Sequence, residues 1–208
     1  MRTPTVITAV AGVAAAFIAP MMAGAAGFGY TSADARFTGL QPGAIVEAHG
    51  PPFAADRDGE SAKSYIRPVE RKSVFAFDFT AEKRVAVRIR LDLNGAVPGR
   101  VLAVTGQGGK IVGAIMDNGD DIAFGDRRRN FRRTPWKGDN AFNTVTLLNE
   151  GGYAKLYING EFFAAQRSPV GTGPATVKLG PLGLNDRLRW IRVRTGDAPA
   201  VTEVAGDD

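Results

Sequence analysis

Apolar and polar residues alternate through most of the chain, from about residue 37 to residue 195. In residues 84–93 every odd-numbered position is valine, isoleucine or leucine, whereas four of the five even-numbered positions carry a charge. A period of two predicts a β-strand with one buried and one solvated face. Phe75, Phe77 and Phe79 predict a second strand by the same rule.

Other short segments repeat this pattern and are expected to be strands: residues 44–48, 100–105, 110–116, 143–149, 153–158, 161–166, 176–180 and 188–194. Asn159-Gly160 is the strongest hairpin signal, because a type I′ turn needs a positive φ at both central residues. Asn94-Gly95 and Asn118-Gly119 predict similar turns. Many short strands joined by such turns predict an all-β sandwich of two antiparallel sheets over residues 36–195.

A more specific pattern lies in residues 142–147, Phe-Asn-Thr-Val-Thr-Leu, and residues 153–162, Tyr-Ala-Lys-Leu-Tyr-Ile-Asn-Gly-Glu-Phe. It resembles the concanavalin A-like and laminin-G-like jelly rolls, in which W-N-x-V-x-L is followed by a-x-L-Y-I-N-G-x. Residues 188–194 resemble the final strand of those domains. The resemblance covers roughly residues 74–194 and implies a jelly-roll-like sandwich. Its motifs are structural, so it implies no activity.

The first 35 residues have the three parts of a signal peptide. Arg2 is the only charge before Asp34, an apolar stretch follows it, and Ala23-Gly24-Ala25 has the A-x-A form that precedes a cut. A second such site is Ala33-Asp34-Ala35. The uncharged span is equally long enough for one transmembrane helix. In that interpretation the side chains that anchor the helix in the membrane would be Val6, Ile7, Val10, Val13, Phe17, Ile18, Met21 and Met22.

Both interpretations place the rest of the chain on the periplasmic or extracellular side of a membrane. Export makes nucleic acid an unexpected partner, and the net charge of +5 favours an acidic one. The chain of 208 residues has no cysteine, which excludes disulfides, thiol catalysis and thiolate metal sites.

Residues 127–137 combine six cations and two aromatic residues in eleven positions. Guanidinium groups bind carboxylate or phosphate through two parallel hydrogen bonds, so this segment is predicted to be a loop that contacts an acidic partner. The alternative is a solvated loop whose tryptophan packs under the edge of the sandwich. The predicted partner-binding residues are Arg127, Arg128, Arg129, Phe131, Arg132, Arg133, Trp136 and Lys137.

The other candidate groups indicate little chemistry. Glycosidases of this superfamily carry E-x-D-x-x-E on one strand, and the chain has no such motif. His49 is the single histidine and is expected to be a loop residue. A weak calcium candidate is Asp117, Asp120 and Asp121, for which an acidic hairpin turn is the favoured interpretation. Trp190 shares the even-numbered face of its strand with Leu188, and we expect it to pack in the core.

These observations predict a non-catalytic accessory subunit without a cofactor. It would be membrane-tethered, and its sandwich would dock on a larger membrane assembly or on an anionic membrane surface. A carbohydrate-binding, lectin-like module is the alternative, and a glycoside hydrolase-like enzyme the third. Residues 196–208 carry acidic side chains without periodicity and predict a flexible or docking tail.

Overall fold

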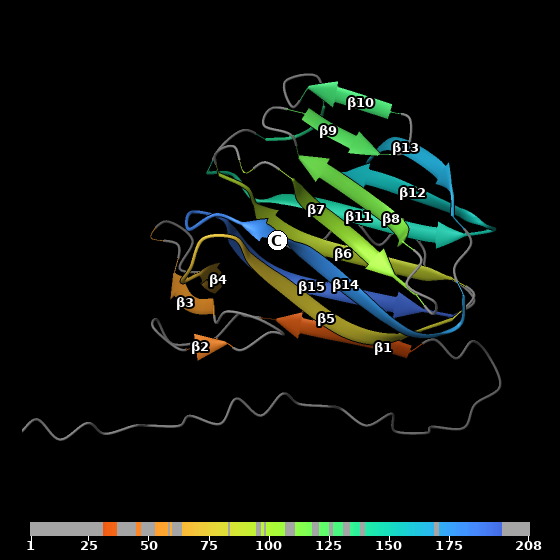
Figure 1. The fold of residues 1–208 in the computed structure, drawn as a ribbon, viewed down its shortest axis with the longest axis horizontal. Coiled ribbons are helices and arrows are strands. Elements are labelled where there is room, and N and C mark those ends of the chain that lie inside the picture. Colours follow the sequence, from red (N-terminus) through yellow and green to blue (C-terminus); the bar gives the residue numbers. More distant parts are fainter. Residues whose placement is uncertain are drawn as a thin grey trace, which may run out of the picture.

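The computed structural model describes residues 31–36, 45–46, 53–57, 59, 64–82, 84–94, 97, 99–106, 111–117, 121–124, 127–130, 134–137, 140–168 and 171–196. This part of the chain is built from strands and turns (Figure 1). Among these residues no helix has the length and apolarity to span a membrane. The predicted signal or anchor helix lies outside the described residues.

A large sheet contains nine strands in the order β13-β12-β11-β6-β15-β4-β3-β2, and β1 also pairs with β15. All of these pairings are antiparallel. The strands are β1 (Thr31–Arg36), β2 (Ile45–Val46), β3 (Phe53–Arg57), β4 (Ser64–Pro68), β6 (Val85–Asp92), β11 (Asn143–Glu150), β12 (Tyr153–Ile158), β13 (Glu161–Arg167) and β15 (Arg187–Thr195).

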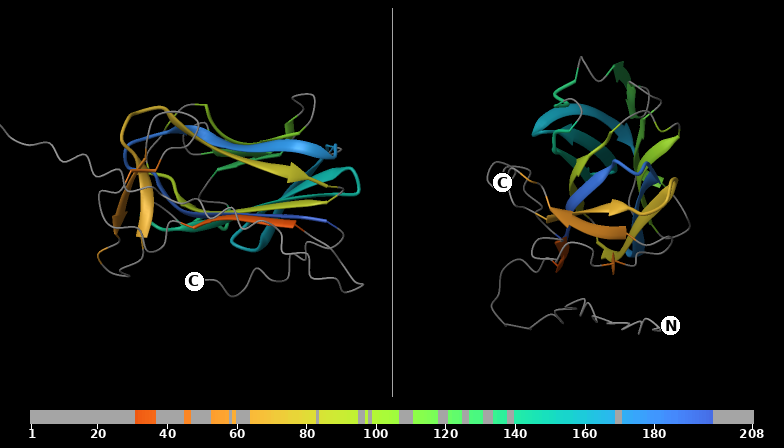
Figure 2. Two further views of the ribbon diagram at one scale, coloured as in Figure 1. Left: turned by 90° about the horizontal axis from the view of Figure 1, so that it is seen from below. Right: turned by 90° about the vertical axis from the view of Figure 1, so that its left-hand side faces the viewer.

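A smaller sheet contains six strands in the order β10-β9-β8-β7-β14-β5, again all antiparallel. The strands are β5 (Ser73–Ala81), β7 (Arg100–Thr105), β8 (Ile111–Asp117), β9 (Asp121–Phe124), β10 (Arg127–Asn130) and β14 (Gly173–Leu182). The two sheets form two layers (Figure 2). Between them lies one hydrophobic core, which includes Ile89, Leu147 and Ile191 of the large sheet and Val104 and Val177 of the small one.

The predicted alternation is confirmed. Val85, Val87, Ile89 and Leu91 of β6 are all core residues, and Leu93 packs against them. The Asn159-Gly160 hairpin is confirmed as well, because β12 pairs with β13 across it. Asn159 and Gly160 have φ values of 51° and 85°. These are the two positive φ angles that a type I′ turn requires.

Strand β8 pairs with β9, so the chain reverses between Asp117 and Ile122, whereas the predicted Asn118-Gly119 turn itself lies outside the described residues. The Asn94-Gly95 hairpin is wrong. Strand β6 before it belongs to the large sheet and β7 after it to the small one, so this segment connects the two layers. An Asn-Gly pair permits a tight turn, but it does not determine which strands pair.

Two further expectations need correction. The segment 127–137 is not a loop throughout, because Arg127–Asn130 forms β10 at the edge of the small sheet. Leu188 and Trp190 do not share a face, because a β-bulge between them shifts the register. Leu188 therefore joins the core, whereas Trp190 pairs with Arg90 on the opposite, outer face. An extra residue in one strand reverses the faces of all residues beyond it.

Candidate functional site

The structure separates the members of the predicted partner-binding segment. The exposed side chain of Arg129 on β10 lies with its guanidinium carbon 5.6 Å from the centre of the Phe163 ring. Trp136 is half-buried and packs against the core, and Lys137 is exposed. The backbones of Arg127 and Arg128 lie in β10, whereas Phe131, Arg132 and Arg133 lie outside the described residues. Their contact with a partner stays a prediction.

The other predicted groups are equally spread. Asp117 ends β8 and Asp121 begins β9, so the two aspartates flank a hairpin. Asp120 and His49 lie outside the described residues, as do the eight anchoring side chains from Val6 to Met22. Within the described part of the chain, no three His, Cys, Asp or Glu side chains gather to hold a metal ion.

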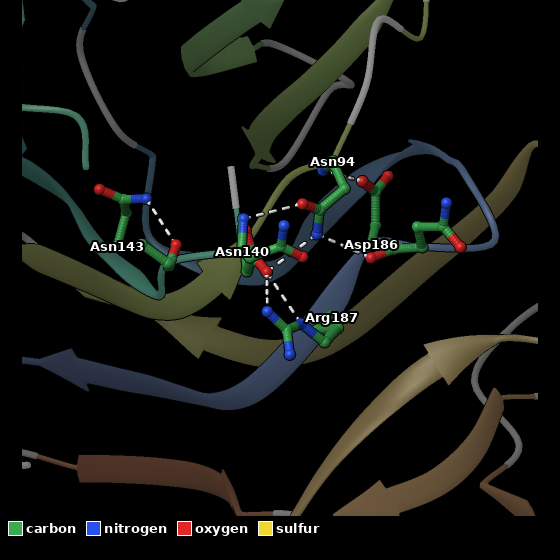
Figure 3. Close-up of polar contacts among 8 residues, drawn as sticks. Asn94, Asn140, Asn143, Asp186 and Arg187 are labelled. Atoms are coloured by element: carbon green, nitrogen blue, oxygen red, sulfur yellow. Dashed lines mark hydrogen bonds and ion pairs between the residues drawn. The ribbon is translucent and has the colours of Figure 1, made fainter. Parts of the chain in front are cut away.

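A cluster of polar side chains lies where the β6–β7 and β14–β15 connections meet residues 134–143 (Figure 3). Asn94 is at its centre. Its side-chain amide donates to Asp92 Oδ2 at 2.8 Å and to the carbonyl of Asn185 at 2.9 Å. Its side-chain oxygen accepts from the backbone N–H of Asn140 at 2.9 Å. The sequence predicts only a turn at Asn94.

Two ion pairs complete this cluster. Arg100 Nη2 lies 3.0 and 2.8 Å from the two carboxylate oxygens of Asp186, and both side chains are almost completely buried. The same carboxylate accepts hydrogen bonds from the backbone N–H groups of Asn94 and Gly183, with an N···O distance of 2.7 Å in each. Burial raises the pKa of Asp186, and Arg100 and the two N–H groups oppose that rise. The second pair joins Arg187 to the fully buried Asp92.

This end cluster is structural. Its hydrogen bonds run between the protein's own loops, and its two carboxylates are buried. A ligand would have to break internal ion pairs to reach either carboxylate. The cluster thus holds the β6–β7 connection, the β14–β15 connection and residues 134–143 together at one end of the sandwich. A ligand would therefore bind at another surface.

The outer face of the large sheet carries a second concentration of arginines. On β15, Trp190, Arg192 and Arg194 alternate with the core residues Ile191 and Val193. On the neighbouring strand β6, Arg90 pairs with Trp190 and Arg88 pairs with Arg192. We define the arginine face as Arg88, Arg90, Trp190, Arg192 and Arg194.

The guanidinium groups pack around the indole ring. The guanidinium carbon of Arg192 lies 4.6 Å from the Trp190 ring centroid, and that of Arg88 lies 5.6 Å from it. Both distances are within the range of cation–π attraction. Burial, and to a smaller extent the charge of Arg194, lower the pKa of Arg88. Arg194 thus repels Arg88, and the backbone register places Asp34 of β1 opposite Arg192.

The face extends across the sheet through β11 and β12. Thr144 and Thr146 pair with Arg90 and Arg88, and Tyr157 pairs with Thr146. Arg90 Nη1 donates to the hydroxyl of Thr144 at 2.9 Å. The alternation of arginines in β6 and β15 was visible in the sequence. The bulge that turns Trp190 toward them left no sequence signal.

Comparisons with known proteins bear on the fold alone. No family model and no curated protein matches the chain. Among solved structures, a sialidase of Trypanosoma rangeli aligns with a TM-score of 0.51 and 11% identity, over 87% of this chain and 32% of the sialidase. The same enzyme with 2,3-difluorosialic acid aligns with a TM-score of 0.51 and 10% identity, over 81% of this chain and 31% of the sialidase. The chain thus spans about a third of each sialidase chain.

A sheep galectin-11 aligns more weakly, with a TM-score of 0.41 and 11% identity, over 57% of this chain and 95% of the galectin. The likeness to the sialidase agrees with the two antiparallel layers described above. The resemblance found in the sequence is confirmed at the level of the fold: the described part of this chain is a jelly-roll-like β-sandwich.

Proposed function

We propose that the protein is a non-catalytic binding module that takes an acidic carbohydrate on its arginine face. One observation carries the proposal: Arg88, Arg90, Arg192 and Arg194 lie on adjacent strands around Trp190, on the side of the sheet that faces away from the core. Guanidinium groups bind carboxylates and sulfates through charge-assisted, often paired hydrogen bonds.

The spacing of the cations favours a linear polyanion. Arg192 and Arg194 are two residues apart on one strand, which places them about 7 Å apart, and the pair Arg88–Arg192 spans the roughly 5 Å between strands. A polysaccharide with a carboxylate or sulfate on successive sugars can contact several such groups together. The sialidase crystallised with 2,3-difluorosialic acid shares only the fold, so it serves to choose an acidic sugar as a first ligand.

The absence of catalysis is part of the proposal and is supported by the sequence, which lacks the E-x-D-x-x-E arrangement. Export by the N-terminal apolar segment is also part of it. Acidic polysaccharides are common outside cells, so the predicted location and the proposed ligand agree.

Docking on a larger membrane assembly remains a second candidate. The observation that favours it is the exposed Arg129 on the edge strand β10, with Lys137 also exposed nearby in the sequence. This second candidate predicts that replacing the cations of the segment 127–137 weakens co-purification with other membrane proteins. Replacing the cations of the arginine face should not weaken it.

The test compares binding to a sulfated polysaccharide, to a polyuronate and to a neutral glucan. The variant Arg88→Gln/Arg192→Gln removes two cations from the arginine face. Its matched control, Arg57→Gln/Arg71→Gln, removes two exposed cations elsewhere. We expect the first variant to bind either polyanion about tenfold more weakly per lost arginine, and the control to bind normally.

Three results would contradict the proposal. Equal weakening in both variants would show that only net charge matters. Equal binding to the neutral glucan would show that the anion is not recognised. Binding to anionic vesicles but to none of the polysaccharides would assign the face to a membrane surface.

A further inference from the structure

The hairpin of β12 and β13 carries exposed aromatic rings on the side of the large sheet that faces away from the core. The even-numbered residues of β12, from 154 to 158, belong to the core, so Tyr153 and Tyr157 lie on the outer face. On β13, Phe162 pairs with Tyr157, and the two ring centroids lie 5.6 Å apart in an edge-to-face arrangement. Tyr153 is 51% exposed and Phe162 is 58% exposed. We define the aromatic ledge as Tyr153, Tyr157 and Phe162.

Exposed apolar side chains are concentrated on this hairpin. Among the residues whose exposure the structure describes, the large hydrophobic side chains that are exposed are Val69, Tyr153, Phe162 and Leu184. Val69 and Leu184 lie singly in the connections after β4 and after β14. Single exposed apolar residues are common, whereas a group of them marks a contact surface. Threonine or valine would serve the strands equally well, so the rings indicate binding.

The size and the surroundings of the ledge favour a sugar over a protein partner. About half of Tyr153 and of Phe162 is exposed, so these two rings offer only roughly 200 Å². A stable protein interface needs about 800 Å² from each partner. Lys155, between the two tyrosines on the same face, pairs with Glu150 at 2.7 Å, and Arg167 is exposed opposite Tyr153. A sugar ring has a C–H face that stacks on an aromatic ring and hydroxyl groups that bond to such polar neighbours.

The spacing of the rings favours a linear oligosaccharide. Tyr153 and Tyr157 are four residues apart on one strand, which separates them by about 13 Å. Between the two ends, β13 presents the small, exposed side chain of Ala165. The ledge also continues a row of paired residues from the arginine face, because Arg88 pairs with Thr146 and Thr146 pairs with Tyr157. Two strand spacings, about 10 Å, separate Arg88 from Tyr157 along this row.

We propose that the aromatic ledge stacks on the sugar rings of a linear oligosaccharide. Phe162 and Tyr157 hold one ring, and Tyr153 holds a second ring further along the chain. The inference rests on the proposed function only in taking the ligand to be a carbohydrate, because stacking needs no acidic group on the sugar. The ledge thereby selects for length, since a short fragment does not reach both ends of it.

The test titrates the full chain with a hexasaccharide and a disaccharide of one polyuronate, and with a hexasaccharide of a neutral glucan. The ledge variant, Tyr153→Leu/Phe162→Leu, keeps apolar side chains and removes two rings. Its matched control, Val69→Ala/Leu184→Ala, removes the exposed apolar side chains outside the hairpin. We expect the ledge variant to bind each hexasaccharide about tenfold more weakly, with a much smaller loss for the disaccharide. The control should bind as the parent does.

Salt dependence and a rescue variant make the result specific to stacking. The rings carry no charge, so the salt dependence of polyuronate binding should be the same in the ledge variant as in the parent. Phe162→Tyr keeps a ring at this position and should retain the parent's affinity. Thermal unfolding of each variant checks that the hairpin remains folded.

The inference is overturned if the ledge variant binds both hexasaccharides as tightly as the parent, if the control loses as much, or if no glycan binds the parent. It is also overturned if the parent self-associates and the ledge variant does not, because the rings would then contact a second copy. Loss of binding to anionic vesicles alone would assign the rings to a lipid surface instead.

The arginine variant separates this inference from the proposed function. If Arg88→Gln/Arg192→Gln binds the polyuronate normally and the ledge variant does not, the ledge binds sugar and the proposed role of the arginine face fails. If only the arginine variant loses affinity, the proposed function stands and the inference on the ledge fails. If both hold, each variant loses affinity, and only the arginine variant loses salt dependence.

Discussion

At the scale of single residues, burial decides how much the loss of one partner of an ion pair lowers the stability of the fold. Arg100 and Asp186 are almost completely buried and lie 2.8 Å apart, whereas Arg67 and Asp56 lie 3.3 Å apart with more than two fifths of each side chain exposed. Water solvates the exposed pair whether or not it forms. The buried carboxylate depends on Arg100 and on two backbone N–H groups for all of its solvation.

Changing Arg100→Met should therefore lower the free energy of unfolding by about 3–5 kcal/mol, because Asp186 would stay buried without its cation. The matched change Arg67→Met should cost less than about 1 kcal/mol. Denaturant unfolding of both variants measures the difference. Equal losses would show that the end cluster is not the internal support described here.

Gly160 tests the hairpin at the same scale. Its φ of 85° is strained for a β-branched residue, so Gly160→Val should lower the free energy of unfolding by roughly 1–3 kcal/mol. Gly171 is the control, because a Cβ there meets no atom within 4 Å and its φ is not in the left-handed region. Thermal unfolding should shift for the first variant only, and equal shifts would argue against the turn.

At the scale of elements, the sequence predicted strands well and pairings poorly. Alternation along β6 identified its core residues, since each strand reports its own buried face. Partners were predictable only across short hairpins, as at Asn159-Gly160. The bulge beside Trp190 and the connection between the two layers at Asn94 depend on contacts between distant segments, so the sequence did not predict them. The set of residues on the arginine face was not predictable for the same reason.

The edge strand β10 gives a second physical reason for the basic segment. An edge strand presents unpaired backbone groups, and charged side chains discourage pairing with another molecule. Arg129→Val should therefore increase self-association, measured by light scattering at rising concentration. Lys178→Val in β14 is the control, because this exposed residue pairs with Ala76 of β5 on one side and Ala103 of β7 on the other. No increase for Arg129→Val would leave partner contact as the better account of this segment.

At the scale of the whole molecule, β1 connects the N-terminal segment to the sandwich. It starts at Thr31, inside the first 35 residues, and pairs with β15 from Thr31–Thr195 to Arg36–Trp190. The second A-x-A site, Ala33-Asp34-Ala35, lies within this strand. Cutting there would divide a strand of the large sheet, whereas Ala23-Gly24-Ala25 precedes it.

A variant that lacks residues 1–30 should consequently keep the stability of the sandwich. A variant that lacks residues 1–36 should be less stable by about 3–6 kcal/mol, because it loses the ladder of β1 and exposes an edge of β15. Unfolding in denaturant, with gel filtration to detect aggregates, compares the two. Equal stability would show that β1 adds little to the sheet.

The pairing of β1 with β15 also constrains when the protein can fold. These strands are separated by more than 150 positions, so the large sheet cannot close around β15 until synthesis has passed Thr195. Contacts between distant segments make folding slow, on the order of milliseconds to seconds for sandwiches of this kind. A growing chain therefore lacks its complete large sheet during elongation. Protein-conducting channels of the unfolded-chain type accept a chain in this incompletely folded state.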